Sequence, residues 1–279
     1  MTGTYSNKRL LTLPYLIWAL IFVIAPIFLI IYYSFSVEID GQFVFSMDNY
    51  KKAFEPVYVN VLQRSITLAL SCTAICLLLG YPIAYILASK EYEHKNFLLF
   101  MFLVPMWMNF LLRTYSWLSI LERNGFVNIV LEFLGLPKMS LLYNNFAVLF
   151  GMVYNFLPFM ILPIYSVLKR MDPGLIEAAQ DLGANSWVFF LRLELPLSIP
   201  GVISGITMVF MPAVTTFIIS DLLGGAQFML IGNLIEHQFL KVNNWHFGSA
   251  ISVILMALLL ISFGIFSMVD KGEEERALF

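Results

Sequence analysis

Charged residues are scarce in this chain. Asp, Glu, Lys and Arg together make up 12% of its 279 residues, whereas hydrophobic residues make up 60%. Soluble domains carry about 25% charged residues, so water is not the main solvent of this protein. The net charge of −2 and the scattered basic residues give no positive surface of the kind that nucleic acids bind. The composition therefore indicates a membrane protein without a nucleic-acid partner.

Residues and motifs that carry catalysis are also scarce. The two cysteines, Cys72 and Cys76, lie four apart in an apolar run, which predicts a shared helix face and a packing role. The three histidines, His94, His237 and His246, are too dispersed for a metal-ligand cluster or a catalytic dyad. No Gly-x-Ser-x-Gly, His-Glu-x-x-His or phosphate-binding Gly-x-x-x-x-Gly-Lys-Ser/Thr motif occurs. We therefore expect no catalytic residue, no metal site and no cofactor bound by this chain.

Long charge-free runs are abundant, and they indicate membrane-spanning helices. A bilayer core of about 30 Å requires about 20 apolar residues in a helix. Because backbone groups in hydrocarbon must be satisfied within their own segment, we predict an all-α polytopic fold rather than open strands. The six expected spans cover residues 12–36, 62–89, 96–119, 145–168, 198–221 and 247–269, within a single transmembrane domain of residues 1–279.

The first run predicts the orientation of the chain. Lys8 and Arg9 precede this run, and Glu38 and Asp40 follow it, so the positive-inside rule places both termini in the cytoplasm. A cleavable secretory signal is the alternative, but the uncharged run Leu10–Val37 is about twice as long as the apolar region of a signal. We therefore expect a multi-pass protein that keeps this run as its first helix.

Two features interrupt the apolar pattern. Arg113 lies about 17 residues, or roughly 26 Å, beyond the start of the third run. We expect its side chain to reach the far headgroups as an anchor, with a charge in a transport path as the alternative.

The segment Leu222–Ile235 is apolar but too short to cross, and it contains Gly224-Gly225. We expect it to dip into the membrane or lie flat at the mouth of a pathway.

The residues between the fourth and fifth runs predict two short helices. Asp172 can cap a helix that has Pro173 in its first turn, and Asn185 or Ser186 can cap a second one. Gly183 lies between them, and its lack of a Cβ allows a helix to end or another backbone to approach.

The same segment resembles a known family. The spacing Glu177-Ala178-Ala179, three residues, Gly183, nine residues, Leu193-Glu194-Leu195-Pro196 resembles the EAA loop of type I ABC importer permeases, although the family usually has isoleucine at the position of Leu193. The resemblance implies a cytoplasmic coupling loop over residues 171–196 that seats on a separate ATPase dimer, which binds ATP and Mg²⁺. An interfacial helix without a partner is the alternative. The coupling residues implied are Glu177, Ala178, Ala179, Gly183, Ala184, Leu193 and Pro196.

Other stretches resemble the first permease subunit of bacterial spermidine/putrescine importers. They include Leu79–Pro82, Val104–Asn109, Leu157–Met160 and Ser220–Ala226. The resemblance implies a bacterial inner membrane, a second homologous permease, an extracytoplasmic substrate-binding protein and a polyamine substrate. A related importer of another small solute is the alternative. An intramembrane enzyme or a secondary transporter is not supported, since neither a catalytic motif nor an internal repeat occurs.

A polyamine path needs carboxylates for ammonium groups and aromatic rings for methylene and cation–π contacts. Asp221 ends the fifth run beside the Gly-Gly pair and fits the first need, with capping of the following segment as the alternative. Outward segments carry about as many acids as bases, so we assign substrate capture to the separate binding protein. The other candidate path residues, for which packing is the alternative, are Trp107, Asn109, Tyr115, Tyr154 and Asn155.

Overall fold

The computed structural model describes residues 4–39, 42–89, 95–172, 174–175, 179, 181, 183, 185–225 and 228–276. The chain forms two compact units, one of residues 1–60 and 234–258 and the other of residues 61–233 and 259–279. Five helices are long and apolar enough to cross a membrane, and a sharply bent pair makes six if it counts as one span.

The first unit begins with one long helical segment. It consists of α1 (Thr4–Ala19), the π-helical turn η1 (Leu20–Ile24) and α2 (Ala25–Ser34). The N–H of Ala25 bonds to Leu20 O, one residue further back than in an α-helix, directly before Pro26. A proline ring has no N–H and clashes with the carbonyl four residues earlier, so the widened turn accommodates it.

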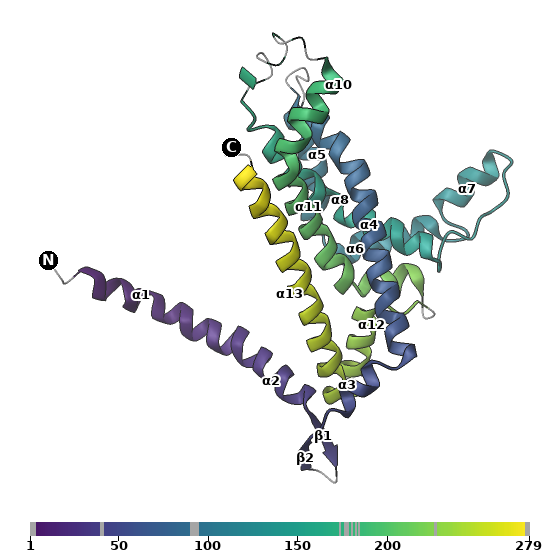
Figure 1. Ribbon diagram of the computed structural model, residues 1–279. Helices are drawn as coiled ribbons and strands as arrows, with labels where there is room; N and C mark the ends of the chain where they lie inside the picture. The colour runs from purple at the N-terminus through teal and green to yellow at the C-terminus, as the bar shows by residue number, and fades with distance from the viewer. Residues whose placement is uncertain are drawn as a thin grey trace. The chain divides into compact units, whose positions relative to one another are not determined.

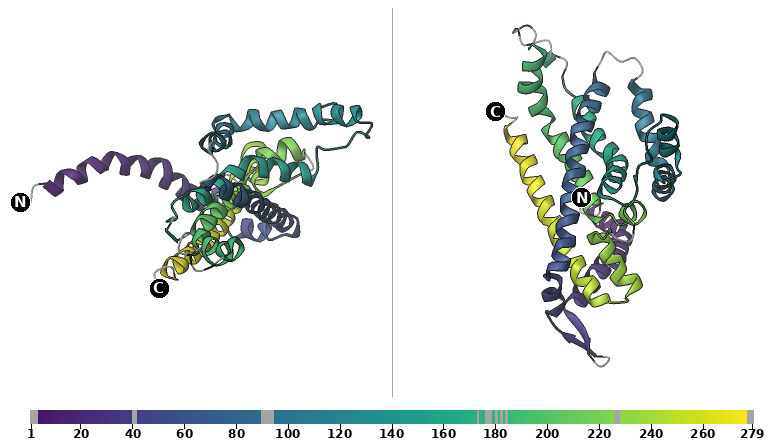
Figure 2. Two further views of the ribbon diagram at one scale, coloured as in Figure 1. Left: turned by 90° about the horizontal axis from the view of Figure 1, so that it is seen from above. Right: turned by 90° about the vertical axis from the view of Figure 1, so that its right-hand side faces the viewer.

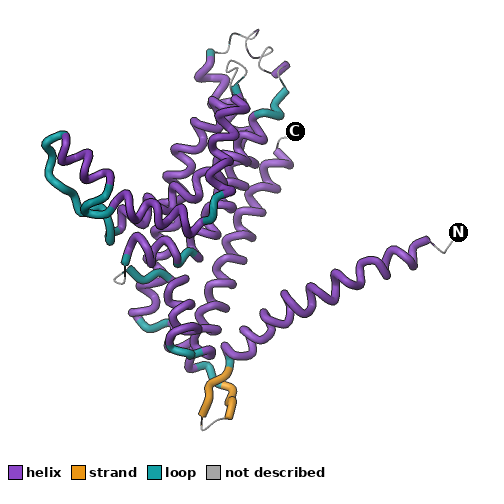
Figure 3. Tube along the Cα trace, turned by 180° about the vertical axis from the view of Figure 1, so that it is seen from behind, coloured by secondary structure: helices purple, strands orange, loops and turns teal. Residues whose placement is uncertain are grey.

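A hairpin and a short helix follow in the same unit. Strand β1 (Ser36–Ile39) pairs antiparallel with β2 (Gln42–Phe45), as the orange segments of Figure 3 show. The helix α3 (Asp48–Ala53) packs at the base of the hairpin, where Asn49 Nδ2 donates to Ser36 O at 2.9 Å. These contacts fix the turn that leads into the next long helix.

The C-terminal part of the chain completes the first unit. The π-helical turn η4 (His237–Lys241) leads to the start of α13 (Trp245–Arg276). His246 hydrogen-bonds Ser36 Oγ through Nδ1 at 2.9 Å, and its ring lies 5.4 Å from the Tyr33 ring. The beginning of α13 is therefore fastened to the base of the hairpin.

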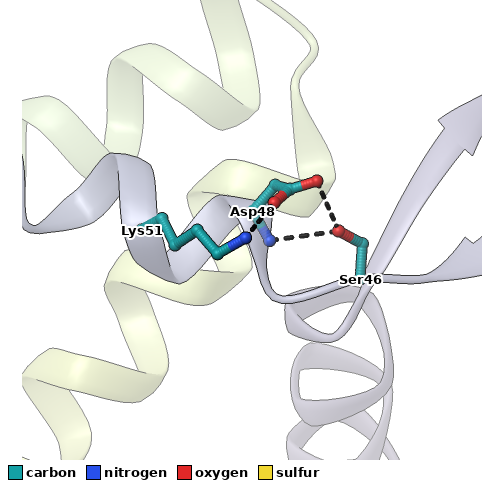
Figure 4. Close-up of polar contacts among 3 residues, drawn as sticks. All are labelled: Ser46, Asp48 and Lys51. Atoms are coloured by element: carbon teal, nitrogen blue, oxygen red, sulfur yellow. Dashed lines mark hydrogen bonds and ion pairs between the residues drawn. The ribbon is translucent and has the colours of Figure 1, made fainter.

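The start of α3 is held by a charged contact that Figure 4 shows in detail. Lys51 Nζ lies 2.9 Å from Asp48 Oδ1, and Ser46 Oγ donates to Asp48 Oδ2 at 2.8 Å. Both contacts favour the ionised carboxylate. The hydrogen bond from Lys51, followed by that from Ser46, lowers the pKa of Asp48 from its ordinary value.

A carbon-13 NMR titration of the Asp48 carboxyl should therefore give a pKa below the ordinary aspartate value, and Lys51→Met should raise it toward that value. Because the folded state favours the charged form, this contribution to stability is present above the ordinary pKa and is lost as pH falls through the lowered one. Lys52→Met is the control, since Lys52 Nζ lies over the Phe247 ring instead, 4.6 Å from its centroid. An unchanged titration in Lys51→Met would contradict the assigned cause.

The second unit is built around three long helices that pack side by side. They are α4 (Pro56–Ala88), α8 (Asn145–Leu168) and α11 (Leu195–Thr215) (Figure 1). Helices α8 and α11 pack along each other, and α4 meets α8 at Gly80 and α11 through Tyr81, whose Oη lies 2.9 Å from Ser198 Oγ. The last part of α13 joins them through Phe266, whose ring lies 6.0 Å from that of Phe210 on α11.

Met160 of α8 lies at the contact of the three helices and is completely buried. A Cβ atom at Gly80 of α4 would lie 3.0 Å from Met160 Cγ, and one at Gly205 of α11 would lie 2.7 Å from Met160 Sδ. Both glycines therefore provide room for one large side chain. Small residues at helix contacts allow such close packing in a membrane, where water gives no driving force between helices.

The third expected span is broken. Helix α5 (Lys95–Trp107) is followed by α6 (Phe110–Leu121) and α7 (Phe126–Phe133) (Figure 2). The chain bends by 96° between Phe97–Trp107 and Phe110–Phe133. Asn109 lies at the break, where its Oδ1 accepts from the backbone N–H of Leu111 at 2.8 Å. The amide therefore serves as the N-cap of α6.

Arg113 closes this break, and our expectation that it extends to the headgroups is wrong. Its side chain is 8% exposed, and Nη1 donates to the carbonyl of Pro105 at 2.8 Å. The guanidinium also lies over the Tyr154 ring, 5.7 Å from its centroid. The carbonyl of Pro105 also accepts from the backbone N–H of Met108 at 3.2 Å, and Arg113 adds a second donor from the next helix at the point where α5 ends.

Candidate functional site

After α11 the chain folds back within the second unit, up to residue 233. We call residues 216–233 the fold-back segment; it contains the π-helical turn η3 (Ser220–Gly224) and the start of α12 (Ile231–Glu236). A Cβ atom at Gly232 would lie 2.5 Å from Thr215 O, so only glycine allows α12 to approach the end of α11. Gly225 has a φ of +70°, which favours glycine for conformational reasons.

The expected mouth at Gly224-Gly225 is enclosed by protein. Gly224 is buried, and a Cβ atom there would lie 2.6 Å from Phe228 Cβ and 2.8 Å from a side-chain methyl of Val148. The backbone N–H of Tyr143 donates to Leu223 O at 2.8 Å. Irregular backbone at membrane depth requires such surroundings.

Asn233 holds the fold-back segment together. It is 5% exposed, and all four hydrogen-bonding positions of its amide are occupied. Nδ2 donates to Phe217 O at 2.9 Å and to Asp221 Oδ1 at 3.1 Å. Oδ1 accepts from Ser220 Oγ at 2.6 Å and from Leu230 N at 3.1 Å. One buried amide thus ties the end of α11, the turn η3 and the start of α12.

Asp221 is the exposed member of this network. Among the described residues, its carboxylate takes one hydrogen bond, from Asn233, and that bond leaves the second oxygen accessible. The start of α12 is capped by Asn233, which accepts from Leu230 N, and not by Asp221. A carboxylate that is oriented through one oxygen and open at the other can accept a hydrogen bond from an ammonium group.

Three other expected path residues lie on the broken span. Trp107 ends α5 with 76% of its surface exposed, and Tyr115 on α6 is 51% exposed. Asn109 caps α6 through its side chain. No hydrogen bond, ion pair or ring contact in the described part of the chain joins any of them to Asp221.

Tyr154 and Asn155 lie in the middle of the length of α8. The Tyr154 ring packs edge-on against Trp117, with a centroid distance of 5.1 Å, and faces Arg113. Asn155 is 1% exposed and donates to Gly151 O at 2.8 Å, while its Oδ1 has no partner among the described residues. These two side chains therefore have packing roles, and their part in a path stays a prediction.

The coupling loop of residues 171–196 is described in part. Glu177, Ala178 and Ala184 lie outside the described residues. Asp172 Oδ1 accepts from Gly174 N at 2.9 Å, and Asn185 Oδ1 accepts from Val188 N at 2.8 Å. The second bond identifies Asn185, and not Ser186, as the N-cap of α10 (Ser186–Phe189).

Among the coupling residues that the structure describes, Gly183 is the most informative. It is exposed, its φ is +76°, and no atom lies within 4 Å of the position that a Cβ would take. The backbone therefore favours glycine here, and the space around it is open. Ala179 is half-buried at the start of the same stretch.

Leu193 and Pro196 lie where the loop continues into α11. The π-helical turn η2 (Phe190–Glu194) joins α10 to α11, and the N–H of Leu195 bonds to Phe190 O directly before Pro196. The proline produces this widened turn for the same reason as Pro26 does in the first helix. Residues 186–215 thus form one continuous helical segment.

Sequence reasoning missed Asn233 as the centre of the fold-back segment. The signal was present, because Asn233 is the one amide in the apolar stretch from Leu230 to Ile235. A lone amide at membrane depth requires hydrogen-bond partners. Which groups those partners are follows only from the folded backbone.

Known proteins resemble this chain over most of its length. Residues 80–272 match the family of binding-protein-dependent transport system inner membrane components. The spermidine/putrescine transport system permease protein PotB of Escherichia coli K12 is 41% identical over 252 residues, which cover 88% of this chain and 92% of that protein. The protein of the same name from Haemophilus influenzae is 40% identical, with 87% and 88% covered.

A solved structure shows the same fold. A chain of a bacterial ABC transporter involved in the import of the acidic polysaccharide alginate aligns with a TM-score of 0.76 at 18% identity, over 94% of this chain and 96% of that one. The predicted type I ABC importer permease fold is thereby confirmed. The chain belongs to the family of binding-protein-dependent transport system inner membrane components and is a multi-pass ABC permease subunit, not an enzyme.

Proposed function

We propose that this protein is a permease subunit of an ATP-driven polyamine importer and forms half of a translocation pathway with a second, homologous permease. The observation that carries the proposal is the identity of 41% with a spermidine/putrescine permease over 88% of this chain. Likeness to the alginate transporter at 18% identity supports the fold alone and favours no other solute.

Asp221 supplies the chemistry that a polyamine requires. An ammonium group is bound best by a carboxylate that is already oriented, because less side-chain entropy is lost on binding. Asn233 fixes one oxygen of Asp221 and leaves the residue exposed. In the proposed orientation, with both termini cytoplasmic, this carboxylate lies at the outward end of the pathway.

Asp221→Asn should lower the uptake of spermidine and putrescine about tenfold and leave assembly of the importer unchanged, since one charge-assisted bond contributes roughly 1.5–3 kcal/mol. The asparagine retains an oxygen that can accept from Asn233 Nδ2, so the network stays intact and only the charge is lost. The measurement is uptake of radiolabelled polyamine by proteoliposomes that contain the complete importer.

Glu132→Gln is the matched control for Asp221→Asn. Glu132 is also an exposed carboxylate, but its Oε2 pairs with Lys138 Nζ at 3.3 Å on the segment that includes α7. Equal uptake by wild type and Asp221→Asn would remove this carboxylate from the pathway. Failure of the wild-type importer to transport either polyamine, while another solute enters, would assign it to a related importer.

The proposal also places the coupling loop against a separate ATPase dimer, which holds ATP and Mg²⁺. Around the loop, Trp187 is 67% exposed, Leu191 44% and Leu175 42%. Exposed apolar and aromatic side chains of this kind serve as anchors at protein interfaces. An extracytoplasmic binding protein would deliver the solute; a bacterial alginate ABC transporter has been solved in complex with a periplasmic protein bound to an alginate pentasaccharide.

A further inference from the structure

A row of side chains connects the end of the coupling loop to the last turns of α4. The Phe190 ring, in η2, packs edge-on against both Tyr81 and Tyr85 of α4, with centroid distances of 5.9 Å to each. On its other side it stacks on the exposed Trp187 ring at 6.0 Å. The surface of the loop is thus in continuous contact with α4 through Phe190.

Two hydrogen bonds run beside these rings. Tyr85 bonds to the carboxylate of Glu194, the last residue of η2. One turn further along both helices, Tyr81 Oη lies 2.9 Å from Ser198 Oγ. Ser198 donates its own hydrogen to Leu195 O at 2.8 Å, so Tyr81 is the donor in the contact with Ser198. The tyrosines are four apart on α4, and their two partners are four apart on the facing segment.

Glu194 is placed unusually for a residue whose only role is packing. Its Oε2 is buried and has no hydrogen-bond partner in the described part of the chain. A buried carboxylate oxygen without a partner lowers stability, and an apolar side chain would avoid that loss. The position therefore retains a charged group although packing alone does not require one.

The contact between η2 and α4 matters because η2 is a π-helical turn. A π-helical turn interrupts the regular i→i−4 hydrogen bonding of the α-helix on either side, and such turns occur often at functional sites. A displacement applied at α10 would be absorbed by flexing at η2 unless η2 were fixed to a second helix. The Phe190 ring against Tyr81 and Tyr85, and the hydrogen bond between Tyr81 and Ser198, fix the turn to α4, and the contact of Tyr85 with Glu194 adds to them.

We propose that Glu194 is a positioning residue that transmits movement of the coupling loop into α4 through Tyr85, while Ser198 and Tyr81 form a second contact of the same kind. The inference rests on the proposed docking of the loop on an ATPase. It adds that α4, and not α11 alone, receives the displacement. Loss of the contact should uncouple ATP hydrolysis from transport rather than prevent either subunit from binding.

The test uses the complete importer in proteoliposomes with its binding protein. Glu194→Ala should lower uptake about tenfold while ATP hydrolysis continues, so the ATP consumed per solute imported rises about tenfold, within the usual range of coupling effects. Tyr85→Phe should give the same result, and the double variant should be no worse than either single one. Glu194→Gln, which still offers an oxygen to Tyr85, should remain within about twofold of wild type.

Each outcome decides the inference. An unchanged ratio of ATP to solute in Glu194→Ala, or independent losses that multiply in the double variant, would overturn it. A parallel fall of uptake and hydrolysis in Glu194→Gln would also overturn it, because a merely structural role predicts that pattern. If Gly183→Trp abolishes uptake while Glu194→Ala leaves the ratio unchanged, only this inference fails. If neither substitution has an effect, the proposed docking itself fails.

Discussion

Replacing Gly183 with tryptophan should abolish ATP-driven uptake while the chain stays in the membrane. The space around Gly183 is open, with no atom within 4 Å of a Cβ position, so the indole meets nothing within the described chain. It would instead fill the space that a docked ATPase requires. Uptake by proteoliposomes measures transport, and co-purification measures binding of the ATPase to the permease. We expect both transport and binding to be lost.

Gly135→Trp is the matched control for this substitution. Gly135 has a φ of +74°, close to the +76° of Gly183, and its Cβ position is equally open. Both variants therefore carry the same backbone strain, about 1–2 kcal/mol for a residue with a Cβ. If both variants lose uptake equally, the cause is the strain of a residue with a Cβ at a left-handed backbone position, and not the loss of ATPase docking. Normal uptake by Gly183→Trp with the ATPase still attached would exclude docking at this loop.

Asn233→Leu should destabilise the protein more than any other single substitution proposed. It leaves Leu230 N without its partner, whereas Phe217 O still accepts from Asp221 N at 2.9 Å and Ser220 Oγ can still donate to Phe217 O at 2.8 Å. The unsatisfied N–H costs about 1–3 kcal/mol and each further lost hydrogen bond about 0.5–1.5 kcal/mol, so the loss in the free energy of unfolding should be at least about 2 kcal/mol. Denaturant unfolding of the purified permease in detergent measures it.

Asn155→Leu is the control for the stability experiment. Asn155 is also buried, at 1% exposure, but it makes one hydrogen bond, to Gly151 O within its own helix, and its Oδ1 has no partner in the described residues. Replacing it removes an unsatisfied oxygen as well as a bond, so the net change should be below about 1 kcal/mol. Comparable losses in the two variants would mean that the Asn233 network is not what stabilises the fold-back segment.

Much of the fold was predictable because membrane helices are specified by composition. A long apolar run satisfies its backbone in hydrocarbon as a helix, and the structure confirms a mostly helical permease fold, with one hairpin outside the long helices. Local capping chemistry was equally readable at Asn185, whose side chain bonds to the helix that it precedes. Both inferences depend on residues that are adjacent in sequence.

The break between α5 and α6 could not be predicted in the same way. Its two sides have similar apolar composition, and Asn109 in such a run is compatible with a path, a packing contact or a cap. Arg113 was misassigned because its partner is a backbone carbonyl, that of Pro105, which no residue type identifies. The same limit applies to Asn233, whose partners include two backbone groups.

The π-helical turn before Pro196 also determines in which direction around the helix axis residues 186–189 point. A turn that closes over five residues instead of four contains one residue more than an α-helix needs, and each helical residue advances the chain by about 100°. Residues 186–189 are therefore rotated by about that angle, relative to α11, from where an uninterrupted helix would present them. The number of residues before one proline thus decides the direction in which Trp187 faces.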